Sequence, residues 1–339
     1  MSDIKLLRHG EHINSAYITR DGKNGRAGKS TDAARPDGRA AGIAKRYRKR
    51  NRASDLAVSI GLIKAQYVDA IEYIGIRAHL RGLILLTSAV AAATFIGGGV
   101  ASILSIGHPR SVEFAFIAIF YCFIIFGVYC LLMGIRHELF RPQDEPIIFD
   151  RRRRKVYRLF RESYPGVIGL FRPWPMRAAE YDWDLIDGEH YVEVVTTGET
   201  VTRQHALLFI VRRSKSDPTI IDGFDVVKTI ELSEHNVGPI WEHIRRFMEL
   251  HGPHLQEGET LARQEIPTSL WESIGSVSPF GPKYLEWWRE RPFTTGLYHL
   301  TSPFVLPVFL AWGIFNWMSH KTSFPAAWPA EVIDAVTRP

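Results

Sequence analysis

GLILLTSAVAAATFIGGGVASILSI, residues 82–106, decides the fold class, because these 25 residues carry no charged side chain. At 1.5 Å per residue, a helix of this length crosses a hydrocarbon core of about 30 Å. A second uncharged stretch, FAFIAIFYCFIIFGVYCLLMGI (residues 114–135), follows after only GHPRSVE. So short a connection makes the two helices antiparallel, and helices satisfy their backbone polar groups in lipid. The sequence therefore predicts a transmembrane helical hairpin over residues 82–135 rather than two soluble core helices.

A third apolar stretch, FTTGLYHLTSPFVLPVFLAWGIFNWMS (residues 293–319), is less uniformly apolar and contains Pro303 and Pro307. Membrane helices tolerate proline when neighbouring groups satisfy the freed carbonyls. Trp312 and Trp317 near its end are typical of an interfacial aromatic belt. We expect a third transmembrane helix, with a kinked re-entrant segment or a helix on the bilayer surface as the alternatives.

Small side chains recur every fourth residue along the first apolar stretch. This spacing places them on one face of a helix, where they allow a second helix to approach closely. The predicted helix-packing face consists of Ala89, Ala93, Gly97, Ala101 and Ser105. We expect it to receive the bulky side chains of the second helix, namely Phe114, Phe116, Phe120, Phe123 and Phe126.

The formal charge of +6 is distributed around the hairpin rather than evenly along the chain. Basic residues precede it in KRYRKRNR (residues 45–52) and at Arg77 and Arg81, and follow it at Arg136, Arg141 and in RRRRKVYR (residues 151–158). The loop between the helices has only Arg110. The positive-inside rule therefore predicts a multi-pass membrane protein with the N-terminus and the middle of the chain in the cytoplasm. A full third span would place the tail after Ser319 on the opposite side.

The densest basic cluster is Arg151, Arg152, Arg153, Arg154 and Lys155. We expect it to contact anionic lipid at the cytoplasmic surface, because each basic side chain there contributes about 1 kcal/mol. Nucleic acid is not an expected partner, because the sequence has no recognisable reading module and no aromatic residues interleaved with the charges.

Residues 137–255 form a predicted cytoplasmic module rich in strands. PIIFDRRRRKVYRLF reads as a β-hairpin, and HYVEVVTTGETVTRQHALLFIVRRS and DGFDVVKTIELS add further strands. VGPIWEHIRRFMELHG then changes to helical periodicity, with Ile240, Ile244, Phe247 and Met248 on one face. The fold class is an α+β membrane protein whose antiparallel module ends in an amphipathic helix, with a pleckstrin-homology-like arrangement as the expected outline.

The remaining segments complete the expected domain organisation. Residues 1–60 are rich in Gly, Arg and Ser and are expected to form a basic, largely disordered tail. Residues 61–81 are expected to form a juxtamembrane helix, residues 256–292 a linker, and residues 320–339 a short tail.

The residues give no catalytic, cofactor or metal signature, so we expect a non-enzymatic protein. In DWDLID, Asp182 and Asp184 would share one face of a strand without a third ligand. The histidines around the helix, His235, His243, His251 and His254, are expected at the surface. Cys122 and Cys130 both lie in an apolar stretch, which excludes a disulfide framework and a cysteine-based zinc site.

PIIFDRRRRKVYRLF, YDWDLI and VGPIWEHIRRFMELHGP, following a membrane hairpin, resemble an uncharacterised family of bacterial inner-membrane proteins, a domain of unknown function. The resemblance covers roughly residues 80–253, and the third apolar stretch also suits it. Members are often encoded beside type VI secretion effectors, so the resemblance implies immunity to a toxin or its handling. It carries no active site to these residues.

Two hypotheses from different classes follow. In the first, the lipid-embedded protein binds a protein partner through its cytoplasmic module, the partner being a secreted effector in the immunity version. In the second, it is a membrane-anchored toxin or enzyme acting on lipid, with His299 in its site. A transporter is disfavoured because the hairpin has no intramembrane charge, although a homo-oligomer is compatible with the sequence.

Overall fold

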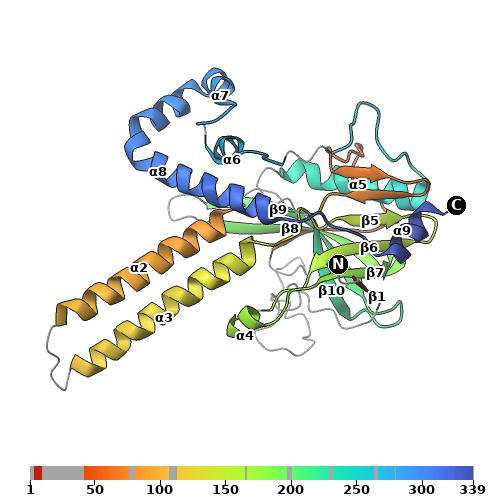
Figure 1. The fold of residues 1–339 in the computed structure, drawn as a ribbon. Coiled ribbons are helices and arrows are strands. Elements are labelled where there is room, and N and C mark those ends of the chain that lie inside the picture. The colour runs from red at the N-terminus through yellow and green to blue at the C-terminus, as the bar shows by residue number, and fades with distance from the viewer. Residues whose placement is uncertain are drawn as a thin grey trace.

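The computed structural model of the chain describes residues 4–9, 42–75, 81–106, 113–164, 166–196, 201–228, 232–262, 266–278 and 280–338. Within them it shows two β-sheets and three long apolar helices, which confirms the α+β class (Figure 1). The pleckstrin-homology-like arrangement stays a prediction.

The first sheet has six strands, some of which precede the membrane hairpin in the chain while the others follow it. Their order is β1 (Lys5–Leu7), β7 (Met176–Asp182), β6 (Lys155–Arg161), β5 (Ile147–Asp150), β4 (Ala70–Tyr73) and β3 (Ile63–Gln66). β1 runs parallel to β7, and the other neighbours are antiparallel. The expected hairpin of β5 and β6 is confirmed.

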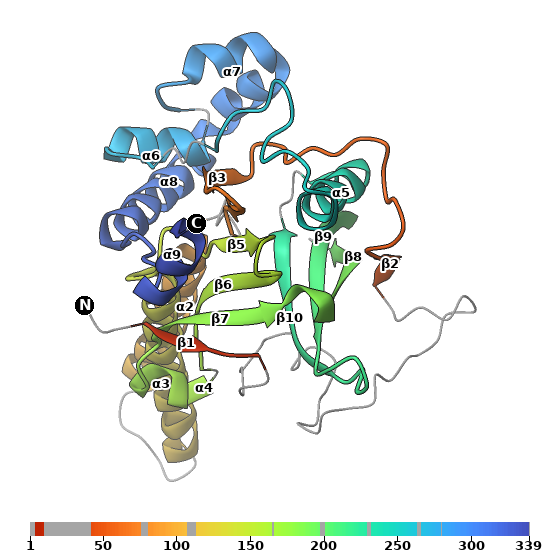
Figure 2. The same cartoon turned by 90° about the vertical axis from the view of Figure 1, so that its right-hand side faces the viewer.

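The second sheet has four antiparallel strands in the order β10 (Ile220–Lys228), β9 (Val201–Arg212), β8 (Ile186–Thr196) and β2 (Ile43–Tyr47). A short 3-10 turn, η1 (Trp183–Leu185), leads the chain from β7 into β8. The strands of the two sheets cross in Figure 2, and α5 (Glu234–Leu250) lies over them.

The core of the module lies between these sheets and α5. Trp183 stacks on Trp241 with 5.8 Å between ring centroids, and Phe209 packs edge-on against Phe149 at 5.9 Å. The predicted apolar face of the helix is confirmed, since Ile240, Ile244, Phe247 and Met248 are all buried. Large aromatic side chains from both sheets therefore fix the module as one packed unit.

The predicted hairpin is present as α2 (Leu83–Ile106) and α3 (Glu113–Glu138), which lie side by side (Figure 1). The third apolar stretch is the helix α8 (Pro292–Thr322), continuous through both prolines. Among the described residues, α2, α3 and α8 are the helices long and apolar enough to cross a membrane. The chain therefore has the composition of a multi-pass membrane protein.

A buried polar junction joins the three helices where they meet the module. The Glu138 carboxylate at the end of α3 accepts hydrogen bonds from the Gly82 backbone N–H (2.8 Å) and the Ser319 hydroxyl of α8 (2.9 Å). The Arg81 carbonyl accepts from Trp312 Nε1 and Asn316 Nδ2 at 2.9 and 3.1 Å. The start of α2 and the ends of α3 and α8 are thus held together.

Four expectations about the segments outside the module were wrong. Residues 63–66 and 70–73 of the predicted juxtamembrane helix are β3 and β4, because β4 pairs with β5 and buries Ile71 and Tyr73. Of the tail expected over residues 1–60, residues 42–60 pack on the module, and residues 10–41 lie outside the described residues.

The segments after α5 also differ from expectation. The expected linker contains α6 (Leu270–Val277) and α7 (Tyr284–Glu290). The tail after Ser319 does not leave the module, because α9 (Ala330–Thr337) buries Val332 and Val336 in a cluster with Ile148 and Tyr157. The carboxyl end of α8 and the module therefore lie on the same side.

Candidate functional site

A segment without regular structure crosses the outer side of α5 between β2 and β3. We call this segment, residues 49–62, the strap. Figure 2 shows it on the part of the module away from α2 and α3. A carboxylate on α5 holds it, and two of its large apolar side chains, Leu56 and Ile60, are exposed, so it differs from an ordinary surface loop.

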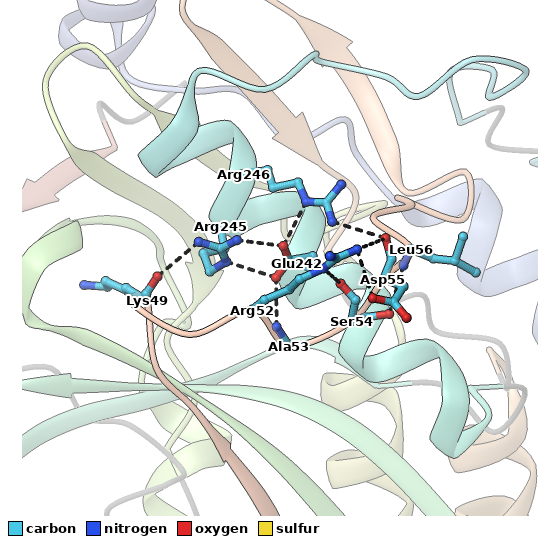
Figure 3. Close-up of polar contacts among 9 residues, drawn as sticks. All are labelled: Lys49, Arg52, Ala53, Ser54, Asp55, Leu56, Glu242, Arg245 and Arg246. Carbon is cyan, nitrogen blue, oxygen red and sulfur yellow. Dashed lines mark hydrogen bonds and ion pairs between the residues drawn. The ribbon is translucent and has the colours of Figure 1, made fainter.

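The first anchor of the strap is Glu242 on α5 (Figure 3). Its carboxylate is fully buried and binds Arg245 through two hydrogen bonds, Nη2 to Oε1 at 2.7 Å and Nε to Oε2 at 2.9 Å. Arg246 Nε donates to Oε1 at 2.8 Å, and the backbone N–H of Ala53 donates to Oε2 at 3.0 Å. One carboxylate thus ties a helix to the strap through charge-assisted hydrogen bonds.

The two arginines extend this anchor along the strap. Arg245 Nη1 donates to the Lys49 carbonyl at 3.2 Å, and Arg246 Nη2 donates to the Asp55 carbonyl at 3.2 Å (Figure 3). Carbonyls that would otherwise need water are therefore satisfied by side chains that Glu242 holds in place.

The charge state of Glu242 follows from these contacts. Desolvation by burial would raise its pKa, but the hydrogen bonds from Arg245, the Ala53 N–H and Arg246 outweigh it and lower the pKa to about 2. The carboxylate is thus ionised at neutral pH. Because its donors are cations or backbone N–H groups, it serves to hold structure rather than to transfer a proton.

A second carboxylate, Glu259, anchors the far end of the strap. Its Oε1 accepts from the backbone N–H of Ser59 at 2.6 Å, the Ser59 hydroxyl at 3.0 Å and the Ile60 N–H at 2.9 Å. Burial would raise its pKa, but hydrogen bonds from the Gln256 and strap N–H groups and from the Ser59 hydroxyl lower it. Ile60 has a φ of +53°. Left-handed backbone is unfavourable for a β-branched residue and persists only where its surroundings enforce it.

The strap exposes large apolar side chains between these anchors. Ala57 and Ser59 point inward and are buried, whereas Leu56 is 66% exposed and Ile60 is 44% exposed. In Figure 3, Leu56 points away from the polar network. Leu261 is also exposed, and the N–H of Ala262 beside it bonds to the Ile63 carbonyl where the strap ends. We call these three exposed apolar side chains, Leu56 and Ile60 on the strap and Leu261 just after Glu259, the apolar patch.

A charged pair lies on the strap just before Leu56. Arg52 pairs with Asp55 at 2.9 Å, and both side chains are well exposed. Apolar side chains within a polar rim are the usual composition of a protein–protein interface. This site could not be found from the sequence, because Leu56 and Ile60 lie in a segment without regular structure and belong to no recognisable motif.

The predicted helix-packing face lies elsewhere on α2. Gly97 has no neighbour within 4 Å of its would-be Cβ, and Ala93, Ala101 and Ser105 are exposed. Ala89 is only partly buried. The face against α3 instead contains Leu85, Ser88, Ala92, Ile96 and Gly99.

Neighbouring residues explain this rotation of the packing face. The glycines of α3 allow the close approach: a Cβ on Gly134 would lie 2.4 Å from Ser88 Cβ, and one on Gly127 would lie 2.8 Å from Ile96 Cγ1. Phe123 and Phe126 do contact α2, through Phe95. Glycines on both helices therefore allow the contact, Gly99 on α2 facing Ile124, and Gly127 and Gly134 on α3 facing Ile96 and Ser88.

The basic cluster of residues 151–155 occupies the turn between β5 and β6. Arg151 pairs with Asp69 at 2.9 Å, and Arg154 pairs with Asp184 at 2.5 Å and Glu249 at 3.0 Å. Lys155 pairs with Glu180 at 2.9 Å and Asp182 at 2.5 Å. Arg152 donates to the Arg338 carbonyl at 3.3 Å, and Arg153 lines a surface pocket with Arg8. These contacts hold the turn against the rest of the module. Contact of the basic cluster with lipid stays a prediction.

The acidic and histidine candidates for chemistry are separated. Asp184 lies in the 3-10 turn η1 rather than on a strand with Asp182. Asp187 pairs with Arg212 at 2.6 Å. Among the described residues, no group of three or more His, Cys, Asp or Glu side chains could hold a metal ion.

The histidines differ from the expected surface positions in one case. His243 is buried, with its Nδ1 at 2.7 Å from the Tyr73 hydroxyl, so the surface prediction for it was wrong. His299 of α8 lies at 2.9 Å from the Tyr284 hydroxyl and packs against the rings of Phe280 and Trp288. It belongs to an aromatic cluster between α7 and α8.

Comparison with known proteins identifies the family. The family of unknown function DUF6708 matches residues 124–338, which is more than half of the chain, so the chain belongs to this family. The matched part begins within α3 and extends to α9. Its first and last residues both lie further along the chain than those of the resemblance expected from the sequence, roughly residues 80–253. No curated protein and no solved structure matches the chain.

Proposed function

We propose that this member of the DUF6708 family is a non-enzymatic, multi-pass membrane protein whose module binds a protein partner through the strap. The observation that carries the proposal is the apolar patch of Leu56, Ile60 and Leu261, held rigid by the Glu242 and Glu259 carboxylates. Binding to a pre-organised surface costs less conformational entropy than binding to a mobile loop.

A protein is the favoured occupant because of where the patch lies. Lipid surrounds the exposed apolar side chains of α2 and α3 in a membrane, but the strap is on the opposite part of the module (Figure 2). The strained φ of Ile60 keeps an apolar side chain exposed at the cost of backbone strain. Backbone strain of this kind is expected where function requires an apolar side chain to stay exposed.

The same proposal places the module in the cytoplasm and names a secreted effector as its partner. Basic residues on both sides of the hairpin favour an inner membrane with the module in the cytoplasm. The family resemblance favours a type VI secretion effector as the partner, with immunity as the outcome. The comparison with known proteins supports neither part.

The test uses full-length protein and the toxin encoded by a neighbouring gene. Wild-type protein should bind the purified toxin in detergent and protect cells that express it. The double variant L56D/I60D should bind at least about tenfold more weakly, because interface energy concentrates in a few apolar contacts. A matched control, I220D, alters an exposed apolar side chain on β10 and should bind normally.

The two failures are distinguishable. If the wild type binds and protects but L56D/I60D does so equally well, the strap is not the interface. If the wild type neither binds nor protects, the immunity version is wrong.

A further inference from the structure

A second surface, independent of the strap, lies where α3 enters the module. It includes α4 (Gly166–Phe171), which Figure 1 shows beside the end of α3. Val167, Ile168 and Phe171 on this short helix are 62%, 63% and 83% exposed. α3 is a candidate membrane span ending at Glu138, so these apolar side chains lie at the level where a bilayer surface would be.

Trp174 organises a basic cluster beside α4. Its Nε1 donates to the Gly169 carbonyl at 3.1 Å, which fixes the ring against the helix. The guanidinium groups of Arg136 and Arg161 lie 5.4 and 4.9 Å from the ring centroid, and the His137 ring lies 4.6 Å away. Cations from α3 and β6 thus gather on one indole.

These arginines lack carboxylate partners of the kind that Arg151, Arg154 and Lys155 have in the β5–β6 turn. Among the described residues, none forms an ion pair with Arg136, Arg141, Arg161 or Arg172. Burial, together with the charges of Arg141 and Arg136, lowers the pKa of Arg161 to about 10 against the opposing charge of Glu145. The Arg136 Nε–H is buried without an acceptor among the described groups. The cluster therefore has an excess of positive charge and an unused donor.

An apolar groove leads from this cluster between the two hairpin helices. It has a volume of about 370 Å³ and is lined mainly by apolar and small side chains of α2 and α3, including Ile84, Ala91, Tyr129 and Met133. His137 lines its end and also contacts Trp174, so the groove and the basic cluster are continuous. Positive charge at the membrane surface joined to an apolar groove in the hairpin matches the two halves of an anionic phospholipid.

We propose that this surface binds an anionic phospholipid, with the headgroup phosphate at Arg136 and Arg161 beside Trp174 and an acyl chain in the α2–α3 groove. Val167, Ile168 and Phe171 enter the same leaflet and seat α4 on the membrane. Arginine suits this role because its fork of N–H donors matches phosphate oxygens. The site differs from the β5–β6 turn, whose cations already have protein partners.

The first test measures lipid binding to the purified full-length protein in a neutral detergent by native mass spectrometry. Phosphatidylglycerol should bind more tightly than phosphatidylcholine, and R136Q/R161Q should weaken phosphatidylglycerol binding by about tenfold or more. The matched control R152Q removes a charge from the β5–β6 turn and should bind as the wild type does. Inorganic phosphate should not displace the lipid.

Three results would overturn the proposal: unchanged binding by R136Q/R161Q, an equal loss in R152Q, or displacement by inorganic phosphate, which would indicate a site for the free ion.

A second test keeps the proposal falsifiable if R136Q/R161Q does not fold. In a chain with Cys122 and Cys130 replaced by alanine, F171C and I220C are labelled with a fluorophore and reconstituted in nanodiscs. Lipids carrying a nitroxide near the headgroup should quench the label at residue 171 and leave that at residue 220 bright. Equal quenching at both positions would show that α4 does not enter the membrane.

Discussion

At the scale of single residues, carboxylates that accept several hydrogen bonds hold the structure together. Glu242 anchors the strap, Glu259 fixes the strained turn at Ile60, and Glu138 joins α2 to α8. Removing one member of a buried ion pair leaves its partners charged and unpaired, which costs more than the pair contributes. This cost applies to Glu242, whose buried carboxylate pairs with Arg245 and Arg246.

Glu242 gives a prediction with a definite pH dependence. Its folded pKa of about 2 lies below the ordinary value of 4.5, so its stabilisation is complete above about pH 4.5 and is lost as pH falls toward 2. We expect E242Q to lower the free energy of unfolding by roughly 3 kcal/mol at pH 7. The difference in melting temperature from wild type, measured in detergent, should narrow between pH 5 and pH 3.

The control for this experiment is E257Q, which changes an exposed glutamate that follows α5 in the chain. E257Q should have the same melting temperature as the wild type at every pH. A difference in melting temperature between E242Q and the wild type that stays constant down to pH 3 would contradict the assignment of the stabilisation to the ionised carboxylate of Glu242.

At the scale of elements, long periodic segments were predictable from sequence and short ones were not. Uncharged stretches predicted α2, α3 and α8, and alternation predicted β5, β6 and β8 to β10. β3 and β4 have four residues each and lie apart in sequence from strands β5 to β10 of the module, and they are held in the sheet because β4 pairs with β5 and β3 pairs with β4. The strap was missed for a related reason, since its anchors Glu242 and Glu259 lie about 200 residues further along the chain.

The packing face of α2 shows the same limit. Small residues occur on two faces of this helix, at Ala89 and Gly97 and at Ala92 and Gly99. Both pairs of residues have a helical spacing, and the contacts of α2 with α3, at Gly127 and Gly134 among others, decide between the two faces. The sequence of one helix could not supply that information.

This difference gives a prediction with a matched pair of variants. G134L places a side chain where Ser88 Cβ lies 2.4 Å away, whereas G97L enters space with no neighbour within 4 Å. Overpacking costs about 1–3 kcal/mol, so G134L should melt several degrees below the wild type in detergent and G97L should not. A destabilised G97L with a normal G134L would restore the face expected from the sequence.

At the scale of the whole molecule, the module is built from chain segments before, between and after the membrane helices. Strands β1 to β4 precede α2, β5 to β10 follow α3, and α9 follows α8. Because β4 pairs with β5 and α9 packs on Ile148 and Tyr157, all three segments must lie on one side of the membrane. The polar junction at Arg81, Glu138 and Ser319 is where the helices leave this module.

This arrangement also constrains α8. Its carboxyl end lies at the junction, and α6 packs beside it, with Gly313 against Ile274 and Ser276 at 3.4 Å from Asn316. The chain therefore leaves the module before α8 and returns along it. Such a path suits the re-entrant alternative for the third apolar stretch, because a full span would require residues 278–291 to cross as well.

The most direct test of the whole account is cysteine labelling with a membrane-impermeant maleimide in spheroplasts, using a chain in which Cys122 and Cys130 are alanine. Single cysteines replace Pro109 in the hairpin loop, Glu257 in the module and Asp334 in α9. The account predicts that residue 109 reacts in intact spheroplasts and that residues 257 and 334 react only after lysis. Labelling of residue 334 from outside while residue 257 is protected, or equal reactivity of residues 109 and 257, would contradict it.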